Sequence, residues 1–180
     1  MFDRETRSRI MRNVRTRKTE PEERLARILA DLGLRVRRND RRVIGTPDFS
    51  SSPHRLAIFV DGDFWHGRAW FERAEAPATN SAFWIRKFEI NQTHDRTVDR
   101  KLRRRGWSVL RIWSSDIRRD PIRTAHRVRK RLRILERVRK SSAASQELTR
   151  ATERAVRRNT KNGAKTSRSR GSKTLPTNRH

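Results

Sequence analysis

The chain has 180 residues, of which only 32% are hydrophobic, so its length fits about one domain with a modest core. Lys and Arg total 47 against 20 Asp and Glu, a formal charge of +27 that predicts a polyanionic partner: nucleic acid first, an anionic membrane surface a distant second. Without cysteine, disulfides and cysteine-ligated zinc are excluded. No apolar run reaches the roughly 18 residues of a transmembrane helix, and no apolar signal core opens the chain. We expect a cytoplasmic protein.

The chain begins with a polar, basic segment over residues 1–18. It reads either as an arm that lies along phosphates, with Arg7, Arg12 and Arg15 among its cations, or as a disordered leader. A helix follows from Thr19 to Gly33, because Thr19 suits its N-cap. Glu22 either completes a capping box at the start of that helix or reaches an active site.

The remaining pattern predicts an α/β fold, with a mixed sheet flanked by helices over residues 19–140 and a disordered basic tail over 141–180, for which a helical start near 146–156 stays open. In chain order we expect a strand at 34–37, a turn at 38–42, a strand start or edge at Pro47, a hairpin turn at 50–53, a central strand at 55–60, a loop at 67–80, a helix at 81–105, a strand at 107–113 and a helix from Pro121. Gly106 ends the predicted helix at 81–105, and a predicted strand follows it directly. A helix between two strands in this way suggests a crossover back to the same sheet.

Two carboxylates stand at the ends of neighbouring predicted strands, Asp48 and Asp61. A hairpin turn between the strands would bring the two carboxylates side by side. Magnesium prefers hard oxygen ligands and is typically bound through one or two carboxylates. Taken singly, each is better explained structurally, since Asp48 can cap a turn and Asp61 can close an Asp-Gly hairpin. The pair together with His66, whose pKa suits a general base, favours a metal-dependent nuclease centre.

Aromatic residues adjoin this centre. Phe64 and Trp65 are consecutive in a turn after a strand, so at most one can easily point inward. Exposed aromatics beside a basic surface stack on bases or insert between base steps. Phe83, Trp107 and Trp113 are expected in the core.

Taken in order, these residues resemble the very short patch repair endonucleases, a branch of the PD-(D/E)xK nuclease superfamily. The resemblance covers roughly residues 6–116 and rests on these pieces: Thr6-Arg7-Ser8, Met11-Arg12, Glu22, Arg24-Leu25, Gly45-Thr46-Pro47-Asp48-Phe49, Ile58-Phe59, Gly62, Phe64-Trp65-His66, Phe83-Trp84, Lys87, Asn91, Asp95, Gly106-Trp107, Val109-Leu110 and Trp113. It implies a restriction-endonuclease-like core and a magnesium-dependent enzyme that nicks double-stranded DNA 5′ to the thymine of a T:G mismatch.

The resemblance also implies roles for individual residues. Asp48, with Asp61 and the main-chain carbonyl of Val60, would bind the metal, and His66 and Glu22 would complete the catalytic group. The expected DNA contacts are intercalation by Phe64, Trp65 and Trp84, and binding by Arg7, Arg12, Arg15, Lys87 and Asn91.

The sequence departs from the family at the positions of its structural zinc, which look like Asp63, Arg68, Trp70 and Ser115. We therefore expect no structural zinc, with packing by Trp70 as a suggested substitute. Two alternatives stay open: a restriction-type or structure-selective endonuclease of the same superfamily, and a non-catalytic basic DNA-binding module. We expect a monomer.

Overall fold

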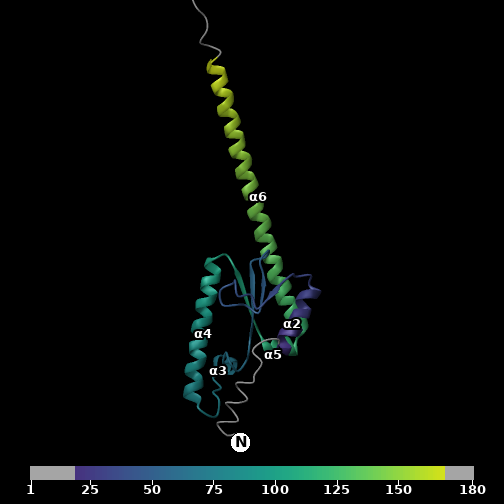
Figure 1. Ribbon diagram of the computed structural model, residues 1–180, viewed down its shortest axis with the longest axis vertical. Coiled ribbons are helices and arrows are strands. Elements are labelled where there is room, and N and C mark those ends of the chain that lie inside the picture. The colour runs from purple at the N-terminus through teal and green to yellow at the C-terminus, as the bar shows by residue number, and fades with distance from the viewer. Residues whose placement is uncertain (1–18, 169–180) are drawn as a thin grey trace, which may run out of the picture. The chain divides into compact units, whose positions relative to one another are not determined.

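A computed structural model describes residues 19–168, with side chains described to residue 154 (Figure 1). The predicted arm, with Arg7, Arg12 and Arg15, lies outside the described residues. The chain separates into two compact units, Met1–Arg133 and Ile134–His180. The first unit carries the sheet and is called the domain below.

The domain contains a four-stranded mixed sheet in the order β1-β2-β3-β4. β1 pairs with β2 and β2 with β3 in antiparallel fashion, whereas β3 and β4 are parallel. This confirms the predicted α/β class with a mixed sheet flanked by helices. In chain order the elements are α2 (Glu20–Asp31), β1 (Arg37–Arg38), β2 (Phe49–Ser51), β3 (Leu56–Asp61), α3 (Arg68–Arg73), α4 (Ser81–Arg104), β4 (Ser108–Trp113), α5 (Ser114–Arg119) and α6 (Pro121–Arg168).

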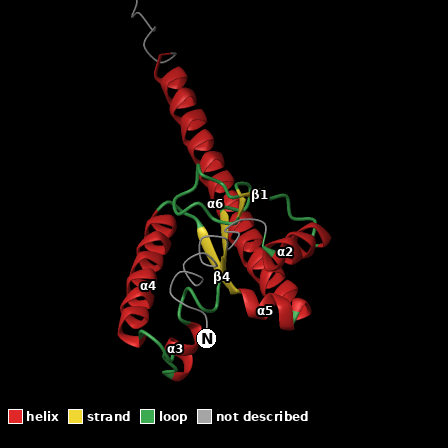
Figure 2. Cartoon of the chain, turned by 60° about the horizontal axis from the view of Figure 1, so that its bottom comes forward, coloured by secondary structure: helices red, strands yellow, loops and turns green. Residues whose placement is uncertain are grey.

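Helices cover both faces of the sheet (Figure 2). On the face covered by α4, a core cluster is formed by Val43, Ala57, Phe59, Val98, Leu102 and Val109. Side chains alternate between faces along a strand, so the intervening buried residues of β3 and β4 face α2, α5 and the first turns of α6. The central strand is thus buried on both faces, as its unbroken apolar run predicts.

Several short segments differ from the sequence prediction. The strand expected at 34–37 is reduced to Arg37–Arg38, and the predicted loop at 67–80 contains the six-residue helix α3. Helix α5 was not predicted at all. These elements are too short for a helical or strand period to show in the sequence. The long helix α4 matches its predicted bounds within one residue.

Helix α6 continues to Arg168, beyond residue 140 where the predicted tail begins. Residues 141–162 contain neither Pro nor Gly and include Ala, Glu, Gln and Arg, which favour a helix. In the second unit, Ile134, Val138 and Leu148 are exposed. The division into a domain ending near 140 and a separate tail stays a prediction.

Candidate active site

Two carboxylates at strand ends, those of Asp48 and Asp61, lie near a third from helix α2, that of Glu22. Asp48 precedes β2, and its Oδ2 accepts a hydrogen bond of 2.7 Å from the backbone N–H of Val60 near the end of β3. Asp61, the last residue of β3, is only 6% exposed, and Glu22 of α2 is 5% exposed. The antiparallel pairing of β2 with β3 therefore places Asp48 beside the C-terminal end of β3, as the hairpin pattern predicts.

The electrostatics of Asp48 are unusual for a carboxylate. Burial, followed by the nearby negative charges of Glu22 and Asp61, raises its pKa to about 6 against the opposing backbone hydrogen bonds. A buried carboxylate that lacks a paired cation is destabilised in its charged form. Asp48, Asp61 and Glu22 all offer carboxylate oxygens, the hard ligand type that Mg²⁺ prefers.

Thr19 donates a hydrogen bond of 2.8 Å to Glu22 Oε1. The same Glu22 carboxylate lies close enough to Asp48 to affect its pKa. The Thr19 hydroxyl makes no hydrogen bond to the backbone of α2, so its half of the predicted capping box is not formed. Glu22 instead combines a contact at the helix start with a place near Asp48.

His66 is held by a carboxylate from α4. Its Nδ1 lies 2.8 Å from Asp95 Oδ2, and its Nε2 lies 3.9 Å from Asp61 Oδ1. An ionised carboxylate only accepts, so this contact places the proton on Nδ1 and leaves Nε2 as the basic atom of the neutral ring. Burial lowers the pKa of His66, but the hydrogen bond to Asp95 and the charge of Asp61 outweigh burial, and the pKa is raised.

Arg111 links the acidic residues of this site. Its guanidinium contacts Asp61 Oδ1 at 2.7 Å, Asp95 Oδ1 at 3.0 Å and Asp99 Oδ1 at 3.1 Å. Among the described residues, the Asp61–His66–Asp95 group could hold a metal ion, with ligand atoms within 4.8 Å of one another. Because Arg111 already contacts both of its carboxylates, this group has a resident cation. A pocket of about 200 Å³ is lined by these residues and Trp113.

Exposed aromatic rings gather next to the centre. The rings of Phe64 and Trp84 lie 4.7 Å apart, those of Trp65 and Trp84 6.0 Å apart, and Phe64 is 5.9 Å from Phe88. We call Phe64, Trp65, Trp84 and Phe88 the aromatic cluster. Phe88 is buried, whereas Phe64 and Trp65 are 44% and 37% exposed. The cluster thus has a buried base and an exposed edge.

The turn that carries Phe64 and Trp65 is fixed from α4. Asn91 Nδ2 donates a hydrogen bond of 2.7 Å to the Trp65 carbonyl. Gly67 adopts a φ of +62°, and a Cβ there would lie 2.6 Å from Phe88 Cγ. Only glycine tolerates both the conformation and the close approach.

Phe83 was predicted in the core, and this prediction was wrong. Its side chain is 62% exposed, and its ring lies 5.3 Å from Trp84. It stands in the first turn of α4, before the helix packs on the sheet. Trp107 packs against the core cluster, whereas Trp113 is half-buried beside His66. The proposed DNA contact Lys87 is exposed on α4.

The structure adds Asp95, Asp99 and Arg111 to the site, to which sequence reasoning gave no roles. A signal existed: Asn91, Asp95 and Asp99 recur every four residues, which places them on one face of a helix. Arg111 interrupts the otherwise apolar run of β4, where a charge calls for a buried partner.

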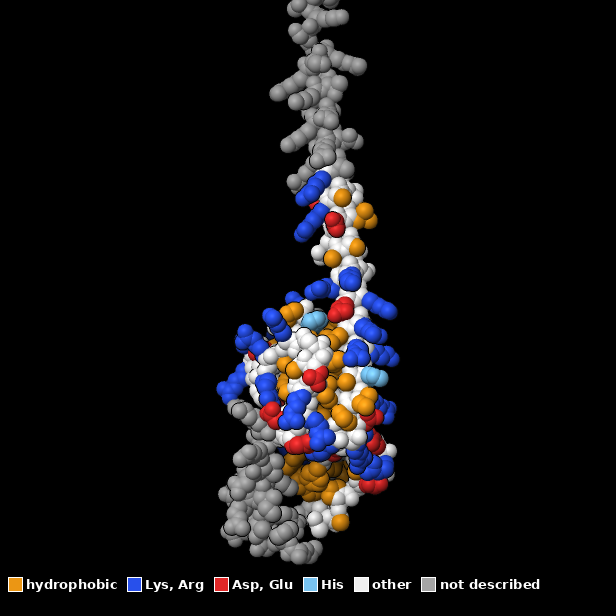
Figure 3. Space-filling view, turned by 90° about the vertical axis from the view of Figure 1, so that its right-hand side faces the viewer, with side chains coloured by type: hydrophobic (Ala, Val, Ile, Leu, Met, Phe, Trp, Pro, Cys, Tyr) orange, Lys and Arg blue, Asp and Glu red, His pale blue; other side chains and the backbone are white. Residues whose placement is uncertain are grey.

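Figure 3 shows Lys and Arg side chains, in blue, around the hydrophobic side chains, in orange, on the visible face of the domain.

Among the helices of residues 19–168, none is long and apolar enough to cross a bilayer.

Comparisons with known proteins agree on one family. The sequence profile of a family described as DNA mismatch endonuclease Vsr matches residues 1–72. The chain is 40% identical over 129 residues to the type II nicking enzyme V.NmeDIP of Neisseria meningitidis serogroup C, covering 72% of this chain and 87% of that one. It is 45% identical over 103 residues to the type II nicking enzyme V.HpaIIP of Haemophilus parainfluenzae, covering 57% and 73%. The DNA mismatch endonuclease Vsr of Escherichia coli K12 is 38% identical over 118 residues, covering 66% and 75%.

Proposed function

Because the chain belongs to the Vsr family of DNA mismatch endonucleases, we propose that it uses magnesium to nick one DNA strand 5′ to the thymine of a T:G mismatch. The observation that carries this proposal is the half-buried Asp48 carboxylate, which lies near the charges of Asp61 and Glu22, beside His66 and an exposed aromatic edge.

Magnesium would be held by Asp48, Asp61 and the main-chain carbonyl of Val60. When bound, the ion supplies charge stabilisation for the leaving oxygen and lowers the pKa of water. The protein fixes this site through the Val60 N–H, which orients the Asp48 carboxylate. Arg111 similarly fixes the Asp61 carboxylate from β4.

His66 is the proposed general base. Asp95 holds Nδ1, so Nε2 faces the acidic centre and accepts the proton of the attacking water. The raised pKa of His66 favours its protonated form, and the positive charge of a bound metal would oppose that effect. Glu22 is the proposed third catalytic residue, since its carboxylate lies beside Asp48.

The exposed edge of the aromatic cluster is the proposed mismatch-sensing element. Inserting Phe64, Trp65 and Trp84 between base pairs requires unstacking, which costs a few kcal/mol and least where pairing is already poor. Phe88 beneath them provides a rigid base for the insertion.

The surrounding basic surface would supply affinity that does not depend on sequence. We propose that Arg7, Arg12, Arg15 and Lys87 contact the DNA backbone. Asn91 is proposed near the DNA, and its observed contact is with Trp65. The enzyme would act as a monomer on chromosomal DNA in the cytoplasm.

The test is a nicking assay on two duplexes that differ only in one T:G mismatch, each with magnesium or with chelator. We expect a magnesium-dependent nick beside the thymine in the mismatched duplex alone. Asp48→Asn should abolish the nick and retain binding, and the matched control Asp31→Asn, on the exposed end of α2, should nick normally. An active Asp48→Asn enzyme would remove Asp48 from the mechanism.

A second candidate is a nicking endonuclease without mismatch specificity, because relatives such as V.NmeDIP and V.HpaIIP bear the name type II nicking enzyme. Magnesium-dependent cleavage of the fully paired duplex at the same rate would favour it. Binding without cleavage of either duplex, across several flanking sequences, would instead favour a non-catalytic DNA-binding module.

A further inference from the structure

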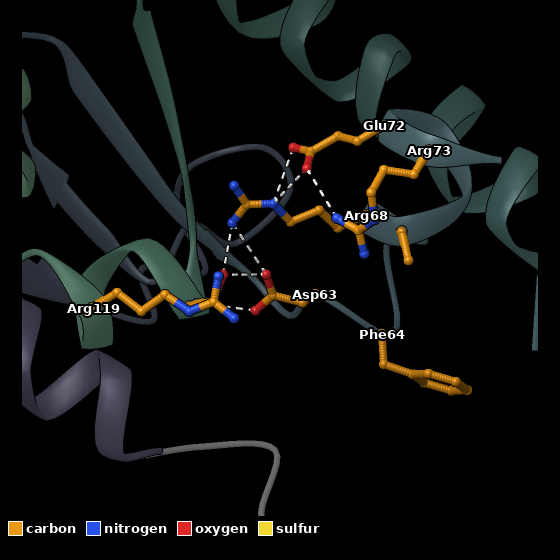
Figure 4. Close-up of a pocket in the computed structure, with 8 residues that line it drawn as sticks. Asp63, Phe64, Arg68, Glu72, Arg73 and Arg119 are labelled. Atoms are coloured by element: carbon orange, nitrogen blue, oxygen red, sulfur yellow. Dashed lines mark hydrogen bonds and ion pairs between the residues drawn. The ribbon is translucent and has the colours of Figure 1, made fainter. Parts of the chain in front are cut away.

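A second charged network lies on the far side of the turn that carries Phe64, Trp65 and His66. The guanidinium of Arg68, at the start of α3, contacts Asp116 at 2.7 Å, Ser115 Oγ at 2.6 Å and Asp63 at 3.2 Å. We call Asp63, Arg68, Ser115 and Asp116 the Arg68 cluster. Figure 4 shows Arg68 between Asp63 and Glu72, with Phe64 pointing away from them.

The acceptors in the cluster are themselves held by α5. Asp63 Oδ2 accepts hydrogen bonds from the Ser114 hydroxyl at 2.5 Å and the Ser115 N–H at 2.9 Å, and the Ser115 hydroxyl donates to Oδ1. These bonds, with Arg68, outweigh the effect of burial and lower the pKa of the Asp63 carboxyl. Asp63 is therefore anchored to the N-terminal end of α5.

Further contacts extend the cluster. Arg127, on the first turns of α6, reaches Asp116 at 3.2 Å. The Arg68 guanidinium lies 5.3 Å from the centre of the Trp113 ring, within cation–π range. The Arg68 side chain is only 22% exposed, so its ion pairs are less screened than those of a surface arginine.

Three residues of the cluster, Asp63, Arg68 and Ser115, stand at positions where the family resemblance implies a structural zinc ion, and Trp70 stands at the fourth. Zinc takes thiolate, imidazole or carboxylate ligands in tetrahedral geometry. Of Asp63, Arg68, Trp70 and Ser115, only Asp63 offers such a ligand, and it already accepts bonds from Ser114, Ser115 and Arg68. A guanidinium carries positive charge and cannot ligate a cation. These residues do not fit zinc.

We propose that the Arg68 cluster replaces a structural metal ion, and that Arg68 is a positioning residue for the aromatic edge and His66. The chain between Asp63 and Arg68 is one turn, closed by a 2.8 Å hydrogen bond from the Arg68 N–H to the Asp63 carbonyl. Asp63 is bound to α5 and Arg68 to Ser115 and Asp116. Both ends of the turn are thus tied to the same helix.

The functional consequence follows from the sequence of the turn. Phe64, Trp65 and His66 lie between the two anchored residues, so the cluster fixes them from one side. Asn91 and Asp95 of α4 fix them from the other side. This positioning role in catalysis and base insertion rests on the proposed function. The claim that the cluster is stable without zinc is independent of the proposed function.

The first test is therefore independent of cleavage. Metal analysis of the purified full-length protein should find zinc well below one ion per chain, and a zinc chelator should leave its melting temperature unchanged. Arg68→Ala should lower the melting temperature by about 5–10 °C. The matched control is Arg73→Ala, an arginine of the same helix that pairs with Glu75 on the surface and should change it little. Stoichiometric zinc, or unfolding by the zinc chelator, would overturn the proposal.

The second test separates positioning from mere stability. At a temperature where Arg68→Ala is fully folded, its nicking rate should fall about 10- to 100-fold, as for other lost supporting contacts. Its affinity for paired DNA should persist. The fluorescence of 2-aminopurine beside the mismatch, which reports base unstacking, should no longer rise on binding.

Guanidinium ion at a non-denaturing concentration should restore part of the nicking rate to Arg68→Ala and none to Arg73→Ala. A fully active, folded Arg68→Ala enzyme, or one that guanidinium cannot rescue, would refute the positioning role. If the wild type cleaves nothing while Arg68→Ala still loses stability without zinc, the proposed function fails and the metal-free cluster stands.

Discussion

Replacing Asp48 by asparagine should remove activity and yet stabilise the metal-free protein. The substitution keeps the shape of the side chain and an oxygen that accepts from the Val60 N–H. It removes a charge whose burial raises the pKa of Asp48 to about 6, above an ordinary value of 3.8. That difference corresponds to an upper limit of about 3 kcal/mol at about 1.4 kcal/mol per pKa unit. Because Asp48 is half-buried, we expect a gain of about 1–3 kcal/mol.

The sign of the pH dependence follows from the same pKa. Below pH 3.8 the carboxyl is protonated in both folded and unfolded chains, so its charge costs no stability. As pH rises through about 6, the folded protein must ionise a buried carboxyl and loses the corresponding stability. The advantage of Asp48→Asn over wild type should therefore be full above pH 6 and shrink as pH falls towards 4.

The buried aspartate Asp40 provides the opposite control. Asp40 is 5% exposed and accepts hydrogen bonds from Arg42 and Ser50. These bonds hold the pKa of the Asp40 carboxyl well below its ordinary value despite burial. Asp40→Asn should therefore destabilise the protein above pH 4.

Urea unfolding in EDTA at several pH values measures both variants. Titration with magnesium should then stabilise the wild type through preferential binding to the folded state and leave Asp48→Asn unchanged. An Asp48→Asn protein less stable than wild type in EDTA at pH 7.5, or one equally stabilised by magnesium, would contradict the picture of a preformed metal site at Asp48.

Three further predictions concern DNA recognition and the turn. Trp65→Ala should lower the preference for mismatched over paired duplex about tenfold in competition binding, because one stacking contact is worth about 1–3 kcal/mol. The control is Ile122→Ala, at an exposed residue of α6. Equal losses of affinity for both duplexes would indicate that Trp65 is structural. Gly67→Ala should cost about 1–3 kcal/mol in urea unfolding, since its Cβ would collide with Phe88 at a positive φ, and an unchanged midpoint would show that the turn is pliable. Removing residues 141–180, with ten basic and two acidic side chains, should weaken binding of both duplexes equally and lower the salt dependence; a selective loss on the mismatched duplex would give the tail a role in recognition.

The long elements were predictable because each carries its own period. The 24-residue helix α4 repeats its apolar face over several turns, and β3 combines an unbroken apolar run with flanking turn residues. Helices α3 and α5 have six residues each and are held by tertiary contacts such as those of Arg68 with Ser115 and Asp116. A six-residue segment contains too few repeats to identify its own conformation.

The site was predictable only where strand ends converge. The pairing of β2 with β3 brings Asp48 to the end of β3, and this neighbourhood follows from a hairpin. The partners of those residues come from elsewhere: Asp95 reaches His66 from α4, and Arg111 reaches Asp61 from β4, fifty residues away. Such pairs depend on the parallel crossover between β3 and β4, whose register the local sequence does not specify.

The charge of the whole chain and the charge of the centre have opposite signs, and the proposed activity uses both. The chain carries +27, yet Glu22, Asp48, Asp61 and Asp95 gather at the centre, where Arg111 pairs with Asp61 and Asp95. An acidic centre favours a divalent cation and repels the phosphate that must approach it. The basic surface attracts the duplex over about a Debye length. A bound magnesium ion would then reverse the sign of the field at the scissile phosphate, so metal and DNA would each favour the binding of the other.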